Sequence, residues 1–259
     1  MRKYFAIFKF NLKSELNFKA DYIFSLLSFA IHILIFNALW DYILKDRAIA
    51  GYSRPGLIWY IIVGEFIAYS IGKKSYIKVS DMIKNGEIAN ILSKPLSFMK
   101  YIIALEATSI VNIAIYFVFA VGLGLCMGGV LHVEPLQILL FVISLILALT
   151  LVILVFVFIG LMAFITEENK SFYLVISKTM LLLVFTPLEF FPSIMQKILS
   201  FLPTTYIVYP PGSILVNFNI HQALFLIGGQ LLSLALVGGA VYLLNMKGVR
   251  SINVNGGYK

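Results

Sequence analysis

Long apolar stretches separated by short polar segments dominate the sequence. The stretch at residues 136–165 is uninterrupted and rich in Leu, Val, Ile and Phe. A helix that crosses a membrane needs roughly 20 mainly apolar residues. The pattern therefore predicts an all-α membrane protein with six spans, at residues 22–44, 57–71, 101–127, 136–165, 171–186 and 223–245.

Residues 1–20 precede the first span and follow a different pattern. Bulky apolar residues recur there at helical spacing among five Lys and Arg residues. A basic amphipathic helix of this kind is typical of the membrane interface, where it lies on lipid headgroups. We therefore expect an N-terminal interfacial helix that contacts membrane lipid.

The polar segment at residues 72–100 holds six lysines between two apolar stretches. Ser80 can cap a short helix, Gly86 interrupts it, and Glu87 can begin a second turn. Apolar residues at helical spacing give each turn a hydrophobic stripe. We interpret the segment as a cytoplasmic loop whose coupling helix contacts a soluble partner through Ser80, Ile83, Gly86, Glu87, Ile88, Ile91 and Leu92.

This interpretation of the loop predicts a phenotype and has an alternative. Replacing Ile83, Ile88 and Leu92 with Asp is expected to release the partner without unfolding the membrane part. The alternative is a helix that lies on the headgroups and is held there by its lysines.

Prolines set residues 187–211 apart from the rest of the chain. Each proline lacks a backbone donor and clashes with the preceding turn. No single helix is expected to run through Pro187, Pro192, Pro203 and Pro210-Pro211. We predict broken, re-entrant helices on the outer side, with Tyr206 and Tyr209 as candidates to line an exit.

Composition and charge support a membrane location. The chain of 259 residues is 61% hydrophobic and 12% charged, whereas about a quarter of the residues in a soluble protein are charged. Sixteen Lys and Arg residues fall on the side of both chain ends and four on the other side. The positive-inside rule therefore places both termini in the cytoplasm of a multi-pass protein of the cell membrane. Anionic lipid explains the net charge of +8 better than nucleic acid, because the basic residues cluster beside apolar stretches.

Glu65 lies near the middle of the second predicted span. An ionised carboxylate at that depth costs about 3 kcal/mol or more, so it must be protonated, paired or exposed to a wet cavity. It is a candidate residue of a translocation path, or a proton-linked group. A carboxyl that is satisfied by a neighbouring hydroxyl, amide or lysine is the structural alternative.

The chain has no motif for catalysis of its own. The GxxxxGK[ST] loop that holds nucleotide phosphates is missing, as are HExxH and GxSxG. Cys126 is the single cysteine, and His132 with Glu134 provides too few ligands for a metal site. We interpret the three scattered histidines as packing or interface residues. We expect no catalytic residue, metal or cofactor in this chain, so any energy source lies elsewhere.

Three segments together resemble a known family. They are GYSRPGLIWY at residues 51–60, IKNGEIANILSKPLSF at residues 83–98 and LPTTYIVYPPGSIL at residues 202–215. In order and spacing they are similar to the permease subunits of ABC-2 type exporters, in particular the viologen-exporter-like group.

The resemblance implies a single transmembrane domain of residues 1–259 with the architecture of a type V exporter permease. It implies six spans, an interfacial helix, a coupling segment at residues 80–92 that Gly86 breaks, and an outer gate region at residues 187–211. ATP and magnesium would bind a separate ABC ATPase subunit, present in two copies. A second permease chain, identical or homologous, would complete an exporter of an amphipathic or hydrophobic substrate across the bacterial cytoplasmic membrane.

Two other classes of function are weighed against this one. A secondary carrier coupled to protons through Glu65 is the alternative. Such carriers often contain repeats and helices broken near the midplane, whereas the breaks here cluster near the outer face. A membrane enzyme acting on lipid-linked substrates would need a polar constellation that the sequence does not supply.

Overall fold

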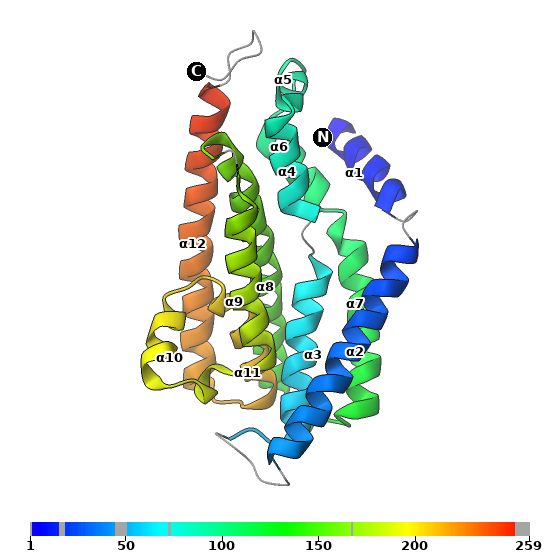
Figure 1. Cartoon of the computed structure of the whole chain (residues 1–259), viewed down its shortest axis with the longest axis vertical. Coiled ribbons are helices and arrows are strands. Elements are labelled where there is room, and N and C mark those ends of the chain that lie inside the picture. Colours follow the sequence, from blue (N-terminus) through cyan, green and yellow to red (C-terminus); the bar gives the residue numbers. More distant parts are fainter. Residues whose placement is uncertain (1, 16–18, 45–50, 72–73, 167, 252–259) are drawn as a thin grey trace.

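A computed structural model describes residues 2–15, 19–44, 51–71, 74–166 and 168–251, and every element in this part of the chain is a helix. The helices α2, α3, α7, α8, α9 and α12 run along the long axis of one bundle (Figure 1). Their bounds are Lys19–Leu44, Arg54–Ser70, Ser109–Met127, Pro135–Leu161, Lys170–Phe185 and Ile220–Ser251.

Short helices lie at the two ends of the bundle (Figure 1). At the end where α1 begins and α12 finishes, here called the terminal end, lie α1 (Arg2–Glu15), α4 (Lys74–Lys84), α5 (Glu87–Leu92) and α6 (Phe98–Glu106). At the opposite, distal end lie α10 (Ser193–Ser200) and α11 (Thr205–Val216). Two 3₁₀ turns, η1 (Met162–Phe164) and η2 (Leu188–Phe190), extend α8 and follow α9.

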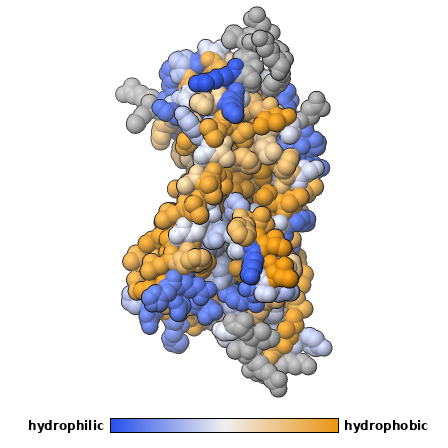
Figure 2. All heavy atoms as spheres, turned by 90° about the vertical axis from the view of Figure 1, so that its left-hand side faces the viewer, coloured by the Kyte–Doolittle hydropathy of each residue, from blue (hydrophilic) through white to orange (hydrophobic). Residues whose placement is uncertain are grey.

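Four helical segments of the described chain are long and apolar enough to cross a membrane: Ala20–Leu44, Phe98–Met127, Pro135–Phe164 and Ile220–Arg250. They confirm four of the six predicted spans by length and composition. The other two predicted spans correspond to α3, with 17 residues, and α9, with 16 residues. Figure 2 shows hydrophobic atoms over much of the middle of one face, and hydrophilic atoms gathered toward its two ends.

Helix α3 is the most enclosed of the long helices. It packs against α2, α7, α9 and α11, and 12 of its 17 residues are buried. Tyr60 lies within it at 0% exposure and donates a hydrogen bond to the carbonyl of Leu183 in α9 (2.8 Å). The other helices therefore surround α3, and the polar atoms of its side chains must find partners within the protein.

The third predicted span is divided into two helices. The sequence predicted one span at residues 101–127, but α6 ends at Glu106 and α7 begins at Ser109. The amide of Thr108 bonds to Leu105 instead of the residue four positions back, and its hydroxyl donates to the same carbonyl (2.7 Å). This tightening of the backbone changes the direction of the helix beside Glu106.

The loop at residues 72–100 forms two helices, as predicted, but Ser80 does not cap either of them. Helix α4 begins at Lys74, so Ser80 lies inside it. Gly86 separates α4 from α5 as predicted, with a left-handed backbone (φ 72°). This conformation is nearly free of strain for glycine alone.

Pro187, Pro192 and Pro203 lie between helices, as predicted, but the expected break at Pro210-Pro211 is absent. Both prolines lie inside α11 and are buried. Pro210 cannot donate to the carbonyl of Tyr206 four residues before it. The side-chain amide of Gln230 in α12 donates to that carbonyl instead (3.0 Å) and also to the carbonyl of Ser144 in α8 (3.0 Å). The helix therefore continues because a neighbouring helix supplies the missing donor.

Candidate functional site

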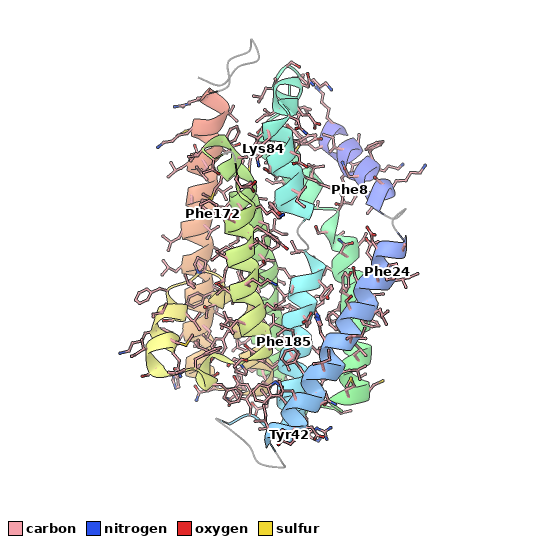
Figure 3. The ribbon with its side chains drawn as sticks, in the orientation of Figure 1. Phe8, Phe24, Tyr42, Lys84, Phe172 and Phe185 are labelled. Carbon is pink, nitrogen blue, oxygen red and sulfur yellow. The ribbon has the colours of Figure 1, made fainter. Side chains whose placement is uncertain are left out.

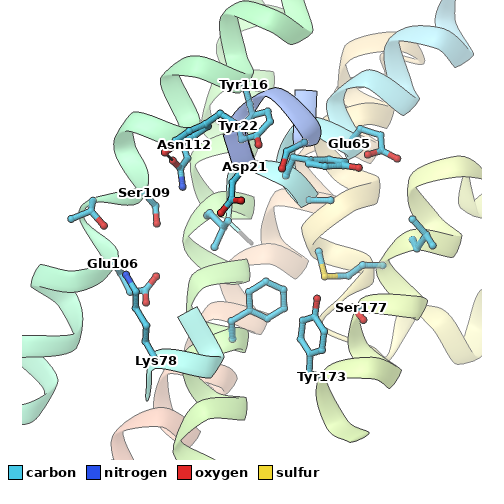
Figure 4. Close-up of a pocket in the computed structure, with 18 of the residues that line it drawn as sticks. Asp21, Tyr22, Glu65, Lys78, Glu106, Ser109, Asn112, Tyr116, Tyr173 and Ser177 are labelled. Atoms are coloured by element: carbon cyan, nitrogen blue, oxygen red, sulfur yellow. Dashed lines mark hydrogen bonds between the residues drawn. The ribbon is translucent and has the colours of Figure 1, made fainter. Parts of the chain in front are cut away.

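A cavity of about 580 Å³ lies between the long helices, with Lys78 of α4 and Glu65 of α3 in its lining (Figure 4). Helices α2, α3 and α7 contribute to its wall, as do α4, α8 and α9. Its volume is in the range of pockets that hold small molecules. Residues with charged or hydrogen-bonding side chains line much of it: Asp21, Tyr22, Ser25, His32, Glu65, Tyr69, Lys78, Glu106, Thr108, Ser109, Asn112, Tyr116, Tyr173 and Ser177.

Glu65 and His32 form a hydrogen-bonded pair at the cavity wall. The Nδ1 atom of His32 lies 3.0 Å from Oε1 of Glu65, and Glu65 is 1% exposed. The sequence required Glu65 to be protonated, paired or in a wet cavity, and the structure gives it both a partner and a cavity. The interpretation of His32 as a packing or interface residue was incomplete, because its ring nitrogen pairs with Glu65. The two residues are 33 positions apart in the sequence, so no local motif could reveal the pair.

The break between α6 and α7 places polar groups on the opposite wall. Glu106 ends α6, and Thr108 and Ser109 follow it, and all three line the cavity. One turn further along α7, Asn112 accepts a hydrogen bond from the hydroxyl of Tyr22 in α2. The sequence assigned no site role to these residues, although a cluster of polar residues at the start of an apolar stretch was the available signal.

The candidate path residues Tyr206 and Tyr209 do not lie at this cavity. Tyr209 donates to Oε1 of Glu189 (2.5 Å) and accepts from the amide of Gln222 (3.0 Å). Tyr206 packs its ring against Gly229, where a Cβ would lie 2.1 Å from the ring. The structure therefore brings Glu65 to the cavity and places the two tyrosines near the distal end.

Six of the seven residues predicted to couple the chain to a partner divide into two sets. Ile83, Ile88 and Ile91 are 0%, 1% and 9% exposed and pack with Leu92 against α6, α8 and α12. Gly86 and Glu87 are exposed, together with Asn85, Asn90 and Lys94. The expectation that Ile83 and Ile88 tolerate Asp without unfolding is therefore wrong, because their side chains belong to the chain's own core.

Ser80 has a different place from the one predicted. It is 3% exposed, and its hydroxyl donates to Oδ1 of Asn169 (3.2 Å). Lys84 donates to the same oxygen (3.3 Å), and the Asn169 amide donates to the carbonyl of Ile159 in α8 (2.9 Å). Figure 3 labels Lys84 near the start of α9, far from Phe185 at its end. Asn169 thus connects α4 to α8 and to the start of α9.

Tyr76 provides a second contact between α4 and α9. Its ring stacks on that of Tyr173 at 4.3 Å. Burial raises the pKa of the Tyr76 hydroxyl, so this group stays neutral at physiological pH. Lys78, two residues further along α4, lines the cavity beside Glu106 (Figure 4). Helix α4 is therefore both the support of α5 and part of the cavity wall.

Long apolar helices around a cavity with both polar and apolar lining define an α-helical membrane protein. Residues 21–256 match the family model described as ABC-2 family transporter protein. The chain belongs to this family and is a transmembrane permease of the ABC-2 type. A comparison with curated proteins finds no match.

Family membership explains several features of the sequence. Permeases of this family are membrane subunits that are generally non-catalytic, and they normally work with an ABC ATPase partner. The missing phosphate-binding loop is consistent with that division of roles. The match does not distinguish the viologen-exporter-like group, and it does not favour a secondary carrier driven through Glu65.

Proposed function

We propose that this chain is the permease of an ATP-driven exporter, in which the cavity receives substrate from the cytoplasmic side. Helix α5 contacts the ATPase, and the terminal end of the bundle faces the cytoplasm. Two ATPase subunits, which bind ATP and magnesium, and a second permease chain complete the transporter. The observation that carries this proposal is the double role of α4, which supports α5 and also lines the cavity through Lys78.

The contacts of α4 support a mechanical connection between the partner and the cavity. A push on α5 acts on α4, because the two helices pack against each other around Gly86. Helix α4 is joined to α9 through Tyr76–Tyr173 and through Asn169. ATP-bound and free ATPase would contact α5 differently, and that difference would shift the balance between two arrangements of the bundle.

Six spans and a cytoplasmic terminal end are part of the proposal. A helix of 17 residues is about 25 Å long, which is close to the thickness of the hydrocarbon layer. Helix α3 is of this length and is covered by its neighbours. Exposed lysines on α1 and at the ends of α4 and α5 gather at the terminal end, as expected for a cytoplasmic face.

The lining of the cavity supports an amphipathic small molecule as substrate. Carboxylate, hydroxyl and amide groups offer hydrogen bonds, while Phe24, Phe156 and Leu181 offer apolar surface. A wholly apolar substrate would leave the polar groups of the wall without partners, at an energetic cost.

Co-purification with the ATPase tests the proposed function. We expect the chain to retain an ABC ATPase encoded beside its gene, and the double variant Glu87→Lys, Asn90→Lys to lose it while eluting from a sizing column like the wild type. Both residues are exposed on α5. The matched control is Lys197→Glu, an exposed charge on α10 at the distal end, which is expected to retain the ATPase. Equal retention by all three proteins would contradict the assignment of α5.

A further inference from the structure

The cavity ends at Glu65 and His32, and aromatic side chains continue from there toward the distal end. His32, Phe36 and Trp40 recur one turn apart on α2 and therefore lie on the same face of that helix. His32 lines the cavity, whereas Phe36 and Trp40 do not. On α2 the lining of the cavity therefore ends at His32, and Phe36 and Trp40 lie beyond it.

Phe185 packs on all three of these residues. Its ring lies edge-on to His32 at 5.8 Å and stacks on Phe36 at 3.6 Å with the planes 5° apart. The indole nitrogen of Trp40 donates to the carbonyl of Phe185 (3.3 Å). Figure 3 shows the labelled Phe185 at the end of α9, on the side toward α2 and α3. The Phe36–Phe185 stack thus lies directly beyond the His32–Glu65 pair.

A cluster of hydrogen bonds lies beyond the aromatic side chains. Trp40 contacts Phe190 (5.2 Å), and Phe190 contacts Tyr52 (5.7 Å). Both Tyr52 and Tyr209 donate to the carboxylate of Glu189, at 3.2 Å and 2.5 Å. We name Tyr52, Glu189, Tyr209 and Gln222 the distal polar cluster. A continuous series of contacts therefore joins the cavity to the distal end.

The backbone beside Phe185 has the features of a hinge. Phe185 is the last residue of α9, and Thr186 follows with an extended backbone (φ −138°, ψ 113°). Pro187 then prevents the helix from continuing. Rotation at residues 186 and 187 would move Phe185 relative to η2, which holds Glu189.

From this geometry we propose that the stacked Phe36–Phe185 pair is the distal gate of the cavity. Separation of the two rings at the Thr186–Pro187 hinge connects the cavity to the distal surface, and the distal polar cluster holds the gate shut. The gate rests on the proposed function in one respect, since a permease needs an exit on the side opposite its cavity mouth. It adds the residues that form the exit.

Labelling of single cysteines tests the gate without substrate or ATPase. Cys126→Ala removes the single cysteine of the chain, and Ser177→Cys then places a thiol in the cavity wall. A charged maleimide that does not cross membranes is added to sealed vesicles of either orientation. Lys94→Cys and Lys197→Cys, both at exposed positions, report which end of the protein faces the reagent.

We expect the thiol at position 177 to react from the terminal side, and about tenfold more slowly from the distal side, because close packing excludes the reagent. Phe185→Ala, and separately Phe36→Ala, are expected to raise the distal rate about tenfold and to leave the terminal rate unchanged. Phe29→Ala is the matched control: Phe29 is a fully buried ring on the same helix α2, and it contacts Tyr69, Tyr116 and Phe119 instead of the gate. It is expected to leave the distal rate low.

Two results would overturn the gate. One is equal labelling of position 177 from both sides in the chain with an intact gate. The other is a low distal rate in both gate variants while their terminal labelling shows that the cavity is folded. Neither result depends on the ATPase, so a failure of the gate and a failure of co-purification are separate outcomes.

Discussion

Helices α4 and α5 at the terminal end and helix α10 at the distal end differ in the side chains that they expose. At the terminal end, α4 and α5 bury Val79, Ile83 and Ile88 and expose Lys84 and Glu87. At the distal end, α10 exposes Ile194 (72%) and Ile198 (59%), and Phe201 directly after it is 88% exposed. Exposed polar groups suit a soluble partner, whereas exposed apolar groups suit lipid or another membrane chain. An amphipathic pattern therefore locates a short helix but does not show which of its faces is exposed in the folded protein.

The largest predicted effect tests the buried face at the terminal end. Loss of the Ile83 side chain from its packed site costs about 2–5 kcal/mol, and a buried carboxylate without a partner adds to that cost. Ile83→Asp is therefore expected to yield aggregated protein, as measured by sizing chromatography in detergent. Ile198→Asp, which alters an exposed residue of α10, is the matched change at the distal end and is expected to elute as a single folded species. Folded Ile83→Asp protein would contradict the contrast between the two ends.

A smaller effect is predicted at the distal end, where Gln230 supplies the donor that Pro210 lacks. Gln230→Leu leaves the buried carbonyl of Tyr206 without a partner, which costs about 1–3 kcal/mol and lowers the thermal midpoint. Pro210→Ala restores a backbone N–H that can reach the same carbonyl. The double variant is therefore expected to lose less free energy of unfolding than the two single variants lose together. Strict additivity in this cycle would show that Gln230 acts on α11 in another way.

Sequence alone could predict the long helices and the positions of the short ones. Spans of apolar residues and the polar breaks between them are local patterns, and the helices α2, α8, α9 and α12 begin or end within a few residues of the predicted bounds. Gly86 was also correctly identified as a break, because the turn needs a residue that tolerates positive φ. The motifs that carried the family resemblance lie within the matched residues 21–256.

The errors share one physical cause, which is a contact between residues far apart in the chain. Which face of α4 is buried depends on α8, where Gly160 has no side chain and lets Val79 approach: a Cβ at Gly160 would lie 2.6 Å from that of Val79. The continuation of α11 through two prolines depends on Gln230 of α12. The cavity depends on the meeting of α2, α3 and α7 with α4 and α9. No local pattern in a single sequence encodes these contacts between helices. Glu65 was therefore the only residue of the candidate site that the sequence could predict.

The smallest predicted effect concerns the residue that precedes a short helix at each end of the bundle. The terminal end turns at Gly86 with a left-handed backbone, whereas α10 at the distal end begins after Pro192 with an extended one (φ −55°, ψ 148°). A left-handed conformation costs a residue with a Cβ about 1 kcal/mol, and no atom lies near enough to obstruct a Cβ at position 86. Gly86→Ala is therefore expected to lower stability by about 1 kcal/mol through the backbone alone, and Gly86→Asn by less, because Asn adopts this conformation more readily.

Thermal midpoints in detergent measure both changes, with Pro192→Ala as the distal counterpart, for which a loss of about 0.4–1 kcal/mol is expected from the freer unfolded chain. If Asn and Ala at position 86 proved equally costly, contacts of the side chain and not the left-handed backbone would set the stability of the α4–α5 turn.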